Sequence, residues 1–290
     1  MGGIMHNMQH VSELTNDIVA SFGKQRAGIP LGIRKVDEYL NGLEPGDFCI
    51  VAGRPSMGKS AYAGTMSLSA SMQHTTLFLS LEMNKQRLIE RMLSSVARVN
   101  CRDMVKGRLC ESDVKKVLEA QQMLNNRKLI IDDQSYLTPS LLRKKISLVD
   151  DIKMVIIDYL QLMYADRRDT REQEVSEISR EMKLIANDFN IPVVALAQLN
   201  RQCESRDDSM PRASDLRESG TLEQNADKIL LLHRSSYYDM QASHTSEDDD
   251  GSAKIIVAKN RNGPCEVCDC TFMSEFVGFY DLPQDELGAF

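Results

Sequence analysis

A short segment with two glycines and a lysine carries the clearest chemical signal in the chain. It fits the pattern G-x-x-x-x-G-K-[ST] and consists of Gly53, Arg54, Pro55, Ser56, Met57, Gly58, Lys59 and Ser60. In such a loop, glycines let successive backbone N–H groups turn toward phosphate oxygens, and the following helix adds its positive N-terminal end. The lysine reaches the β- and γ-phosphates, and the final hydroxyl ligates Mg²⁺. All eight residues are therefore predicted to bind ATP with Mg²⁺.

Three polar residues stand directly after apolar runs, at Glu82, Asp158 and Gln198. Asp158 is suited to hold Mg²⁺ together with Ser60, as a Walker B acid does. Glu82 is suited to orient or deprotonate the attacking water. Gln198 can donate to the γ-phosphate and so distinguish ATP from ADP. An apolar run that ends in a polar residue is common, and Glu82 can equally cap a helix. With the loop, however, the three residues make a complete hydrolytic set.

The elements that position these residues alternate between strand and helix. Predicted strands are Asp47–Ala52, Thr76–Leu81, Lys128–Ile131, Lys153–Asp158, Pro192–Ala197, Asp227–His233, Lys254–Ala258, Glu266–Phe272 and Phe276–Tyr280. Predicted helices are Ala61–Gln73, Asn84–Val99, Ser112–Asn125, Pro139–Val149 and Arg171–Phe189. Met154–Ile157 and Val193–Leu196 are apolar on both faces, as central parallel strands are. The pattern predicts an α/β fold, a doubly wound and mainly parallel sheet with C-terminal antiparallel strands.

The composition is that of a globular protein without a membrane span. The 290 residues are 42% hydrophobic and 27% charged, which is ordinary for a globular protein. A net charge of −7 argues against coating nucleic acid with the whole surface but leaves room for a local basic channel. No apolar run approaches the roughly 18 residues of a membrane span, and we find no secretion signal. Seven cysteines, an odd number, fit a reducing cytosol.

Three of these cysteines are clustered at Cys265, Cys268 and Cys270. A structural zinc site needs four ligands, usually from two such pairs, and only one pair is present. The cluster lies in a strand-like run, where alternation places Cys268 and Cys270 on one face and Cys265 on the other. We therefore interpret it as part of a strand.

The order of motifs resembles the C-terminal ATPase domain of DnaB-type replicative DNA helicases, of superfamily 4, from about residue 28 to about 282. The matching segments are Gly28–Ile33, Gly53–Ser60, Ser80–Met83, Ile156–Leu162, Ala197–Arg201, Asp215–Gly220 and Lys259–Pro264. The resemblance implies a RecA-like P-loop ATPase that forms a hexameric ring, translocates on single-stranded DNA and unwinds duplex DNA at forks. It also implies an N-terminal segment at 1–27 and the motor domain at 28–290.

The resemblance implies roles for two further cations. Lys259 and Arg261 resemble the family pair that reaches into the ATP site of the neighbouring subunit. A guanidinium supplied in trans stabilises charge on the transferring γ-phosphate, and its planar fork suits this better than an ammonium. The alternative is a basic β-turn in solvent. With this pair, the catalytic set comprises Lys59, Glu82, Gln198, Lys259 and Arg261.

The polar segment Asn200–Gly220 resembles the pore loop that grips DNA, and we expect it to be a long structureless loop. The proposed DNA-binding residues are Arg201, Arg212, Arg217, Glu218 and Gly220. The resemblance assigns sugar–phosphate contacts to the last three, and such contacts position a strand without reading its sequence. The arginines of the segment are offset by acids, so binding would depend on a ring that brings several copies around one strand.

The N-terminal part departs from the family pattern. Full-length members carry a helical collar domain that binds primase, and here about 27 residues precede the motor domain. Residues Val11–Lys24 can form an amphipathic helix, with Val11, Leu14, Ile18 and Phe22 on one face. It resembles the linker helix that docks on an adjacent subunit. A helicase loader is an implied partner, whereas primase binding and collar-dependent ring stability stay open.

Two alternatives to a helicase motor remain compatible with the sequence. One is a RecA-type strand-exchange ATPase, which shares the phosphate loop but is not expected to carry both Asp215–Gly220 and Lys259–Pro264. The other is a non-catalytic truncated homologue that regulates a full-length helicase. The cytoplasm of a bacterium or of a phage-infected cell is the expected location. Arg234, Tyr237 and Tyr238 follow a strand and can stack on the base, although we favour surface packing for them.

Overall fold

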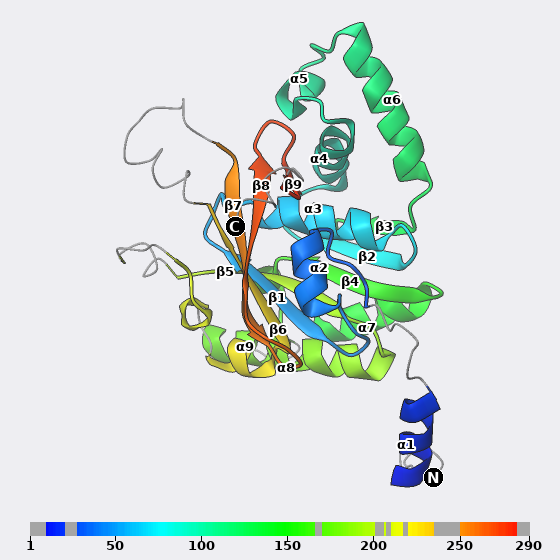
Figure 1. The fold of residues 1–290 in the computed structure, drawn as a ribbon, viewed down its shortest axis with the longest axis vertical. Helices are drawn as coiled ribbons and strands as arrows, with labels where there is room; N and C mark the ends of the chain where they lie inside the picture. The colour runs from blue at the N-terminus through cyan, green and yellow to red at the C-terminus, as the bar shows by residue number, and fades with distance from the viewer. Residues whose placement is uncertain are drawn as a thin grey trace.

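The computed structural model describes residues 10–20, 28–165, 170–200, 206, 210–216, 220–234 and 250–282. Its strands are β1 Phe48–Gly53, β2 Thr75–Ser80, β3 Leu129–Asp132, β4 Ile152–Asp158, β5 Val193–Gln198, β6 Lys228–His233, β7 Ser252–Asn260, β8 Val267–Met273 and β9 Gly278–Tyr280. They form one sheet in the order β3-β2-β4-β5-β1-β6-β7-β8-β9 (Figure 1). The first six strands in this order are parallel and β7, β8 and β9 are antiparallel, which confirms the predicted fold class.

The helices of the described residues are α1 Val11–Ala20, α2 Arg34–Leu40, α3 Lys59–Ala70, α4 Lys85–Ala97, α5 Cys101–Val105, α6 Glu111–Asn125, α7 Pro139–Leu148, α8 Arg171–Phe189 and α9 Gly220–Asn225. The five helices predicted between the first strands are all present. Two begin at strong caps, because the Thr138 hydroxyl accepts from Leu141 N–H and Thr170 forms a capping box with Gln173. Helices α2, α5 and α9 were not predicted, since they span only seven, five and six residues, too few for a helical period to show.

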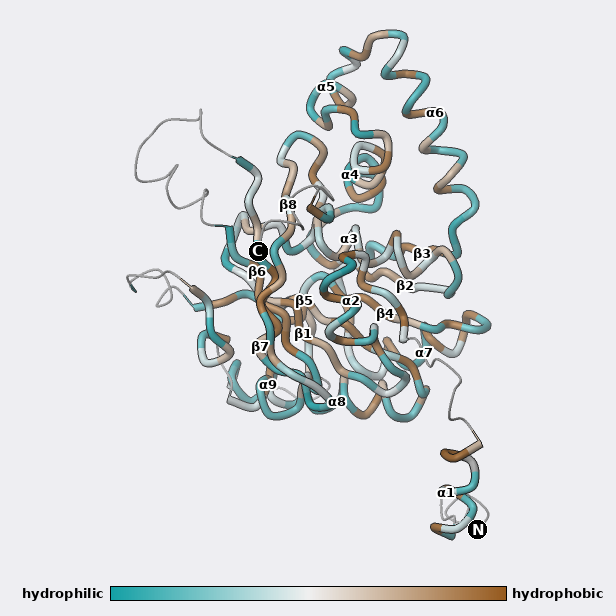
Figure 2. Tube along the Cα trace, viewed as in Figure 1, coloured by the Kyte–Doolittle hydropathy of each residue, from teal (hydrophilic) through white to brown (hydrophobic). Residues whose placement is uncertain are grey.

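Two hydrophobic cores lie on opposite faces of the sheet. Helices α2, α3 and α4 pack on one face and α7, α8 and α9 on the other. In Figure 1, α3 and α4 lie above the sheet and α8 and α9 below it. Along β1 the side chains of Cys49 and Val51 enter the first core, whereas Phe48, Ile50 and Ala52 enter the second. This is the two-residue period of a strand that is covered on both sides. Figure 2 accordingly colours the central strands as hydrophobic.

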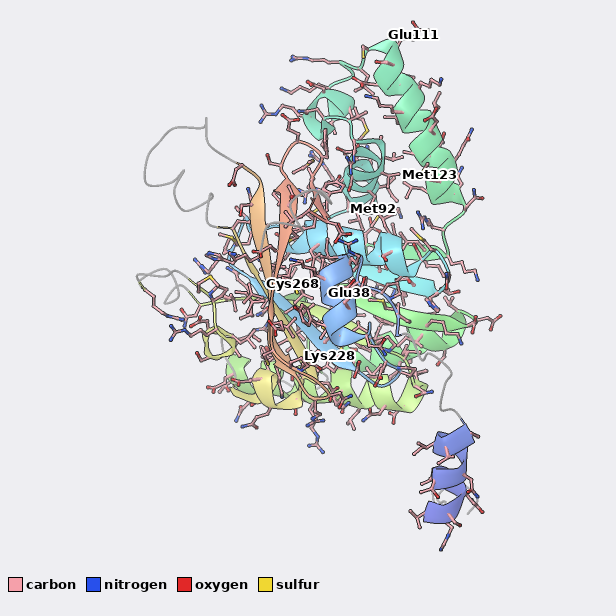
Figure 3. All side chains as sticks on the ribbon, in the orientation of Figure 1. Glu38, Met92, Glu111, Met123, Lys228 and Cys268 are labelled. Carbon is pink, nitrogen blue, oxygen red and sulfur yellow. The ribbon has the colours of Figure 1, made fainter. Side chains whose placement is uncertain are left out.

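Helices α4, α5 and α6 form an arm at the top of the view. A small separate core of Ala97, Val99 and Ala120 holds the arm together, and Glu111 and Met123 mark the two ends of α6 in Figure 3. At the other extreme, α1 stands apart from the domain with its apolar side chains Val11, Leu14 and Ile18 exposed (Figure 1). The predicted helix over Val11–Lys24 is thus present to Ala20, and residues 21–27, Phe22 included, lie outside the described part.

Two of the three clustered cysteines lie in a strand, as expected, and the third precedes it. Cys268 and Cys270 are buried on one face of β8, and Cys265 is exposed before the strand begins. Burial raises the pKa of the Cys268 thiol to about 11 and that of Cys270 to about 12. Both thiols are neutral at physiological pH, whereas metal ligation requires the thiolate. Among the described helices, none combines the length and the hydropathy that a bilayer crossing requires.

Candidate active site

The phosphate-binding loop connects β1 to α3 at the carboxyl edge of the parallel sheet. It turns through left-handed backbone at Ser56, with φ of 67°, and at Gly58, with φ of 93°. Gly58 is the N-cap of α3, so the first turn of the helix opens toward the loop. A side chain at Gly58 is excluded twice, by its φ and by aromatic atoms that an added Cβ would meet.

A cavity of about 460 Å³ lies over this loop. Five of the eight loop residues line it, namely Pro55, Ser56, Gly58, Lys59 and Ser60. The other three do not line it, because Met57 is buried in the core and the Arg54 guanidinium donates to Leu199 O at 2.9 Å. Gly53 ends β1, opposite Gln198 of β5. Of the predicted binding residues, these three shape the loop instead of facing the cavity.

Lys59 is folded back onto its own loop. Its Nζ donates to Gly53 O at 3.0 Å and to Arg54 O at 3.1 Å. Burial lowers the pKa of this ammonium, while the nearby Asp158 and Glu82 oppose the shift. Two carbonyls thus hold the cation at the cavity wall, and a phosphate group would offer it stronger, charged acceptors.

Asp158 lies beneath the loop with one carboxylate oxygen unsatisfied. The Ser60 hydroxyl hydrogen-bonds to the carboxylate, yet burial raises the pKa of Asp158 more than this bond lowers it. Its Oδ2 is buried and has no hydrogen-bond partner among the described residues. A buried orphan carboxylate oxygen beside a serine hydroxyl is a donor set that fits Mg²⁺.

Strand pairing brings Glu82 and Gln198 to the same cavity. Ser80 of β2 is opposite Asp158 of β4, and Leu81 N–H donates to Asp158 O at 2.7 Å, so Glu82 follows at the cavity wall. Gln198 ends β5, and its backbone N–H donates to Gln161 Oε1 at 3.4 Å. The structure therefore gathers Lys59, Ser60, Glu82 and Gln198 around one cavity. Asp158 does not line the cavity itself but is hydrogen-bonded to Ser60, which does.

Five residues that line the cavity were not predicted from the sequence as site residues. They are Ala61 of α3, Arg91 of α4, Tyr159 after β4, and Phe272 and Val277 of the β8–β9 hairpin. An arginine on a helix is usually solvated, and the hairpin is more than 200 residues from the loop in the chain, so no local pattern marks either. Only the packing of α4 and β9 beside α3 brings them to the nucleotide site.

Arg234 is buried and does not lie on the surface, contrary to the interpretation that we favoured. Its guanidinium carbon lies 4.1 Å from the centre of the Phe272 ring, and NH1 donates to Ser56 O at 3.3 Å. The Arg234 side chain thus links the phosphate loop to the Phe272 ring. Tyr237 and Tyr238 lie outside the described residues.

Lys259 and Arg261 lie at the opposite edge of the sheet from the phosphate loop. Lys259 is opposite Ile229, near the start of β6, whereas the loop follows the end of β1. Arg261 N–H donates to Asp227 O and Asp227 N–H donates to Phe48 O, so Arg261 is level with the start of β1, and the six residues of β1 separate it from the loop by about 20 Å. Lys259 Nζ donates to Glu223 O at 2.6 Å and to Gln224 O at 3.4 Å, at the end of α9. Neither cation can serve the ATP site of its own chain.

The segment 200–220 is described in part. Arg201, Arg217 and Glu218 lie outside the described residues, while Arg212 is exposed and Gly220 begins α9. The described part is not the structureless loop that we expected. Asp215 lies in a 3₁₀ turn, Ala213–Asp215. Its backbone carbonyl accepts from Asn200 N–H at 2.8 Å. Its carboxylate accepts from Arg212 N–H at 2.8 Å and pairs with Arg206. The buried carboxylate holds the turn together, and the Asp215 carbonyl ties it to Asn200, just after the end of β5.

The family model of the DnaB-like helicase C terminal domain matches residues 28–281. This match spans all nine strands of the sheet and all the residues that line the cavity. The chain therefore belongs to the DnaB-like helicase C-terminal domain family.

Two curated relatives show how much of such a protein is present. The replicative DNA helicase DnaB of Leifsonia xyli subsp. xyli is 42% identical over 261 residues, which are 88% of this chain and 56% of the relative. The replicative DNA helicase DnaC of Bacillus subtilis is 38% identical over 271 residues, 90% of this chain and 59% of the relative. The chain thus spans somewhat more than half the length of these relatives.

Two solved structures share the fold. A DnaB-like replicative helicase, studied with its interactions with primase, matches with a TM-score of 0.86 and 31% identity, over 95% of this chain and 68% of that one. The second, a solved ATPase domain, matches with a TM-score of 0.85 and 31% identity, over 94% of this chain and 97% of that one.

Proposed function

We propose that this chain is the motor of an ATP-dependent replicative DNA helicase. One observation carries the proposal: Lys59, Ser60, Glu82 and Gln198 surround one cavity, while Lys259 and Arg261 stand at the far edge of the same sheet. Each chain therefore offers half of an ATP site at one edge and the complement of a neighbour's site at the other. Family membership supports a helicase over a RecA-type strand-exchange ATPase.

The roles within one half-site follow from its chemistry. The N–H groups of the 53–60 loop and Lys59 bind the phosphates, and Glu82 accepts a proton from the attacking water. Gln198 donates to the γ-phosphate and so responds to its loss. Ser60 and Asp158 would hold Mg²⁺, which when bound neutralises charge on the phosphates. The buried orphan oxygen of Asp158 supports this donor set.

The other half-site requires a second copy. We propose a ring, hexameric in its active form by analogy with the family, in which Lys259 and Arg261 of one subunit face the γ-phosphate bound by the next. The isolated chain should therefore hydrolyse ATP slowly, since the arginine that stabilises the transferring phosphoryl group is absent.

The DNA-binding surface is proposed to lie along the segment that precedes α9. Arg217, Glu218 and Gly220 would contact the sugar–phosphate backbone, with Arg201 and Arg212 beside them. Such contacts are independent of sequence, as translocation over any sequence requires. The protein partners implied are a loader that places the ring on DNA and further copies of this chain. The segment 1–27 is proposed as a linker and 28–290 as the motor, and primase binding is assigned to neither.

We place this activity in the cytoplasm, where replication occurs and thiols are reduced. All six cysteines in the described part of the chain are free, which supports a reducing compartment.

Two measurements together test the proposal. Sedimentation of the full chain with and without ATP reports ring formation, and a forked duplex with one labelled strand reports unwinding. Rings that unwind the fork with one polarity support the motor. A monomer without unwinding supports the non-catalytic regulator, and pairing of complementary strands without unwinding supports the strand-exchange ATPase. Full DNA-stimulated ATPase in Lys59→Ala would contradict the site assignment.

A further inference from the structure

Asp227 holds a central position at the edge of the sheet that carries Arg261. It connects α9 to β6 and is only 5% exposed. Its Oδ1 accepts from Arg261 NH1 at 2.9 Å, and its Oδ2 accepts from Phe48 N–H at 2.9 Å and from Lys183 Nζ at 2.7 Å. The neighbouring Lys228, labelled in Figure 3, lies low in the sheet, far from the arm at the top.

The backbone reinforces this arrangement. Arg261 N–H donates to Asp227 O at 3.0 Å, and Asp227 N–H donates to Phe48 O at 2.8 Å. Lys183 also donates to Gly46 O at 2.9 Å, so α8 is fixed to the same point. The carboxylate therefore belongs to a framework built from β1, β6, α8 and the β7–β8 turn.

The Arg261 guanidinium is bound by Asp227 on one side and exposed to solvent on the other. Its side chain is 58% exposed although NH1 is engaged by Asp227. A guanidinium has five N–H donors, so the donors that face away from Asp227 are available to a phosphate. The contact thus orients the group without enclosing it.

We infer that Asp227 is the positioning residue for Arg261 in trans catalysis, an inference that rests on the proposed function. It aims the guanidinium at the phosphate bound by the neighbouring subunit. Because Phe48 begins β1 and Gly53 ends it at the phosphate loop, one fully buried strand joins the two half-sites of a subunit.

The charge of Asp227 matters as well as its shape. The carboxylate faces two cations, Arg261 and Lys183, and hydrogen bonds between ionised groups are shorter and stronger than neutral ones. In Asp227→Asn the volume is kept, but the amide accepts through one oxygen and presents donors to cations. The guanidinium then loses its anchor and samples other rotamers. A displacement of a catalytic group by about 1 Å can lower the rate on the order of 100-fold.

The experiment compares DNA-stimulated ATPase of Asp227→Asn, Asp227→Glu and Arg261→Ala in the full chain. We expect Asp227→Asn to lower kcat at least tenfold with the KM for ATP within about twofold, because the loop of each subunit is intact. Asp227→Glu should recover part of the rate. Asp47→Asn is the matched control: Asp47 pairs with buried Lys228 at 2.6 Å at the same edge without touching Arg261, and it should keep wild-type kcat.

Mixed rings separate positioning from misfolding. Asp227→Asn subunits keep a sound phosphate loop, and Lys59→Ala subunits keep a sound Arg261. Mixing the two should therefore raise ATPase above that of either alone, as mixing Arg261→Ala with Lys59→Ala should. No recovery for Asp227→Asn, when Arg261→Ala does recover, would overturn the inference, as would a wild-type kcat in Asp227→Asn. Full ATPase in Arg261→Ala would overturn the proposed trans site itself, and the inference with it.

Discussion

The ring of Phe279 lies directly against Gly58 of the phosphate loop. A Cβ added to Gly58 would come within 2.8 Å of Phe279 Cε2 and 3.1 Å of Phe272 Cε2. The two rings are packed on each other, with centroids 5.0 Å apart. The β8–β9 hairpin therefore requires glycine at this position of the loop. Glycine is also needed there so that the backbone can approach a phosphate closely.

Gly58→Ala should accordingly abolish nucleotide binding and destabilise the domain. The added methyl meets a positive φ and two rings, and overpacking of this kind costs about 1–3 kcal/mol. Fluorescent ATP titration and urea unfolding measure the two effects. Gly64→Ala is the control, since Gly64 lies within α3 and an added Cβ has no neighbour within 4 Å. It should leave binding unchanged and raise stability by up to about 1 kcal/mol. Equal behaviour of the two variants would contradict this account.

Asp158→Asn should raise the stability of the nucleotide-free protein while it eliminates Mg²⁺-dependent ATPase. Burial raises the pKa of Asp158 above its ordinary value of 3.8, so the folded state binds the proton more tightly than the unfolded chain does. The stabilisation that protonated Asp158 provides is complete below pH 3.8, the pKa of the unfolded chain. It is lost as pH rises through the pKa of the folded state. The advantage of the variant, on the order of 1 kcal/mol, should thus grow with pH over that window and then level off. Urea unfolding in EDTA across pH measures it, and a variant less stable than wild type at neutral pH would refute it.

Arg234→Lys should weaken ATP binding although the charge is conserved. Lysine has no planar group that could stack on Phe272 while donating to Ser56 O, and the lost contacts are worth about 1–2 kcal/mol. We expect the KM for ATP to rise about fivefold or more with a smaller change in kcat. Arg98→Lys is a suitable comparison, because Arg98 lies over Tyr280 at 5.0 Å but away from the loop. Indistinguishable KM values for the two variants would remove the role of Arg234.

Asp215→Ala should reduce DNA affinity and leave the basal ATPase intact. The buried carboxylate accepts from Arg212 N–H and pairs with Arg206, and its loss frees the segment that precedes α9. Ordering the segment on DNA then costs more, which we expect to weaken binding about tenfold. Anisotropy with a labelled oligonucleotide measures this. Asp250→Ala removes an equal charge from an exposed position and should have little effect. Unchanged DNA affinity in Asp215→Ala would show that the anchor is dispensable.

Much of the site was predictable because its parts are local. The 53–60 pattern, the polar residues that end apolar strands and the Thr138 and Thr170 caps each depend on a few consecutive residues. Strand and helix periods are likewise local, so the α/β class and all nine strands of the described residues followed from them. The short helices α2, α5 and α9 fell below the length at which a period is recognisable.

By itself, the sequence determined the phosphate loop, the order of the elements and the positions of Glu82, Asp158 and Gln198 at or just after the ends of apolar strands. Only the tertiary structure decided that Arg91, Arg234 and the hairpin rings surround the loop, and that Asp227 anchors Arg261 at the opposite edge. The physical reason is that backbone propensity and turn chemistry act between near neighbours. The contact of Asp227 with Phe48, 179 residues apart in the chain, arises from strand pairing and side-chain packing, which no local pattern encodes.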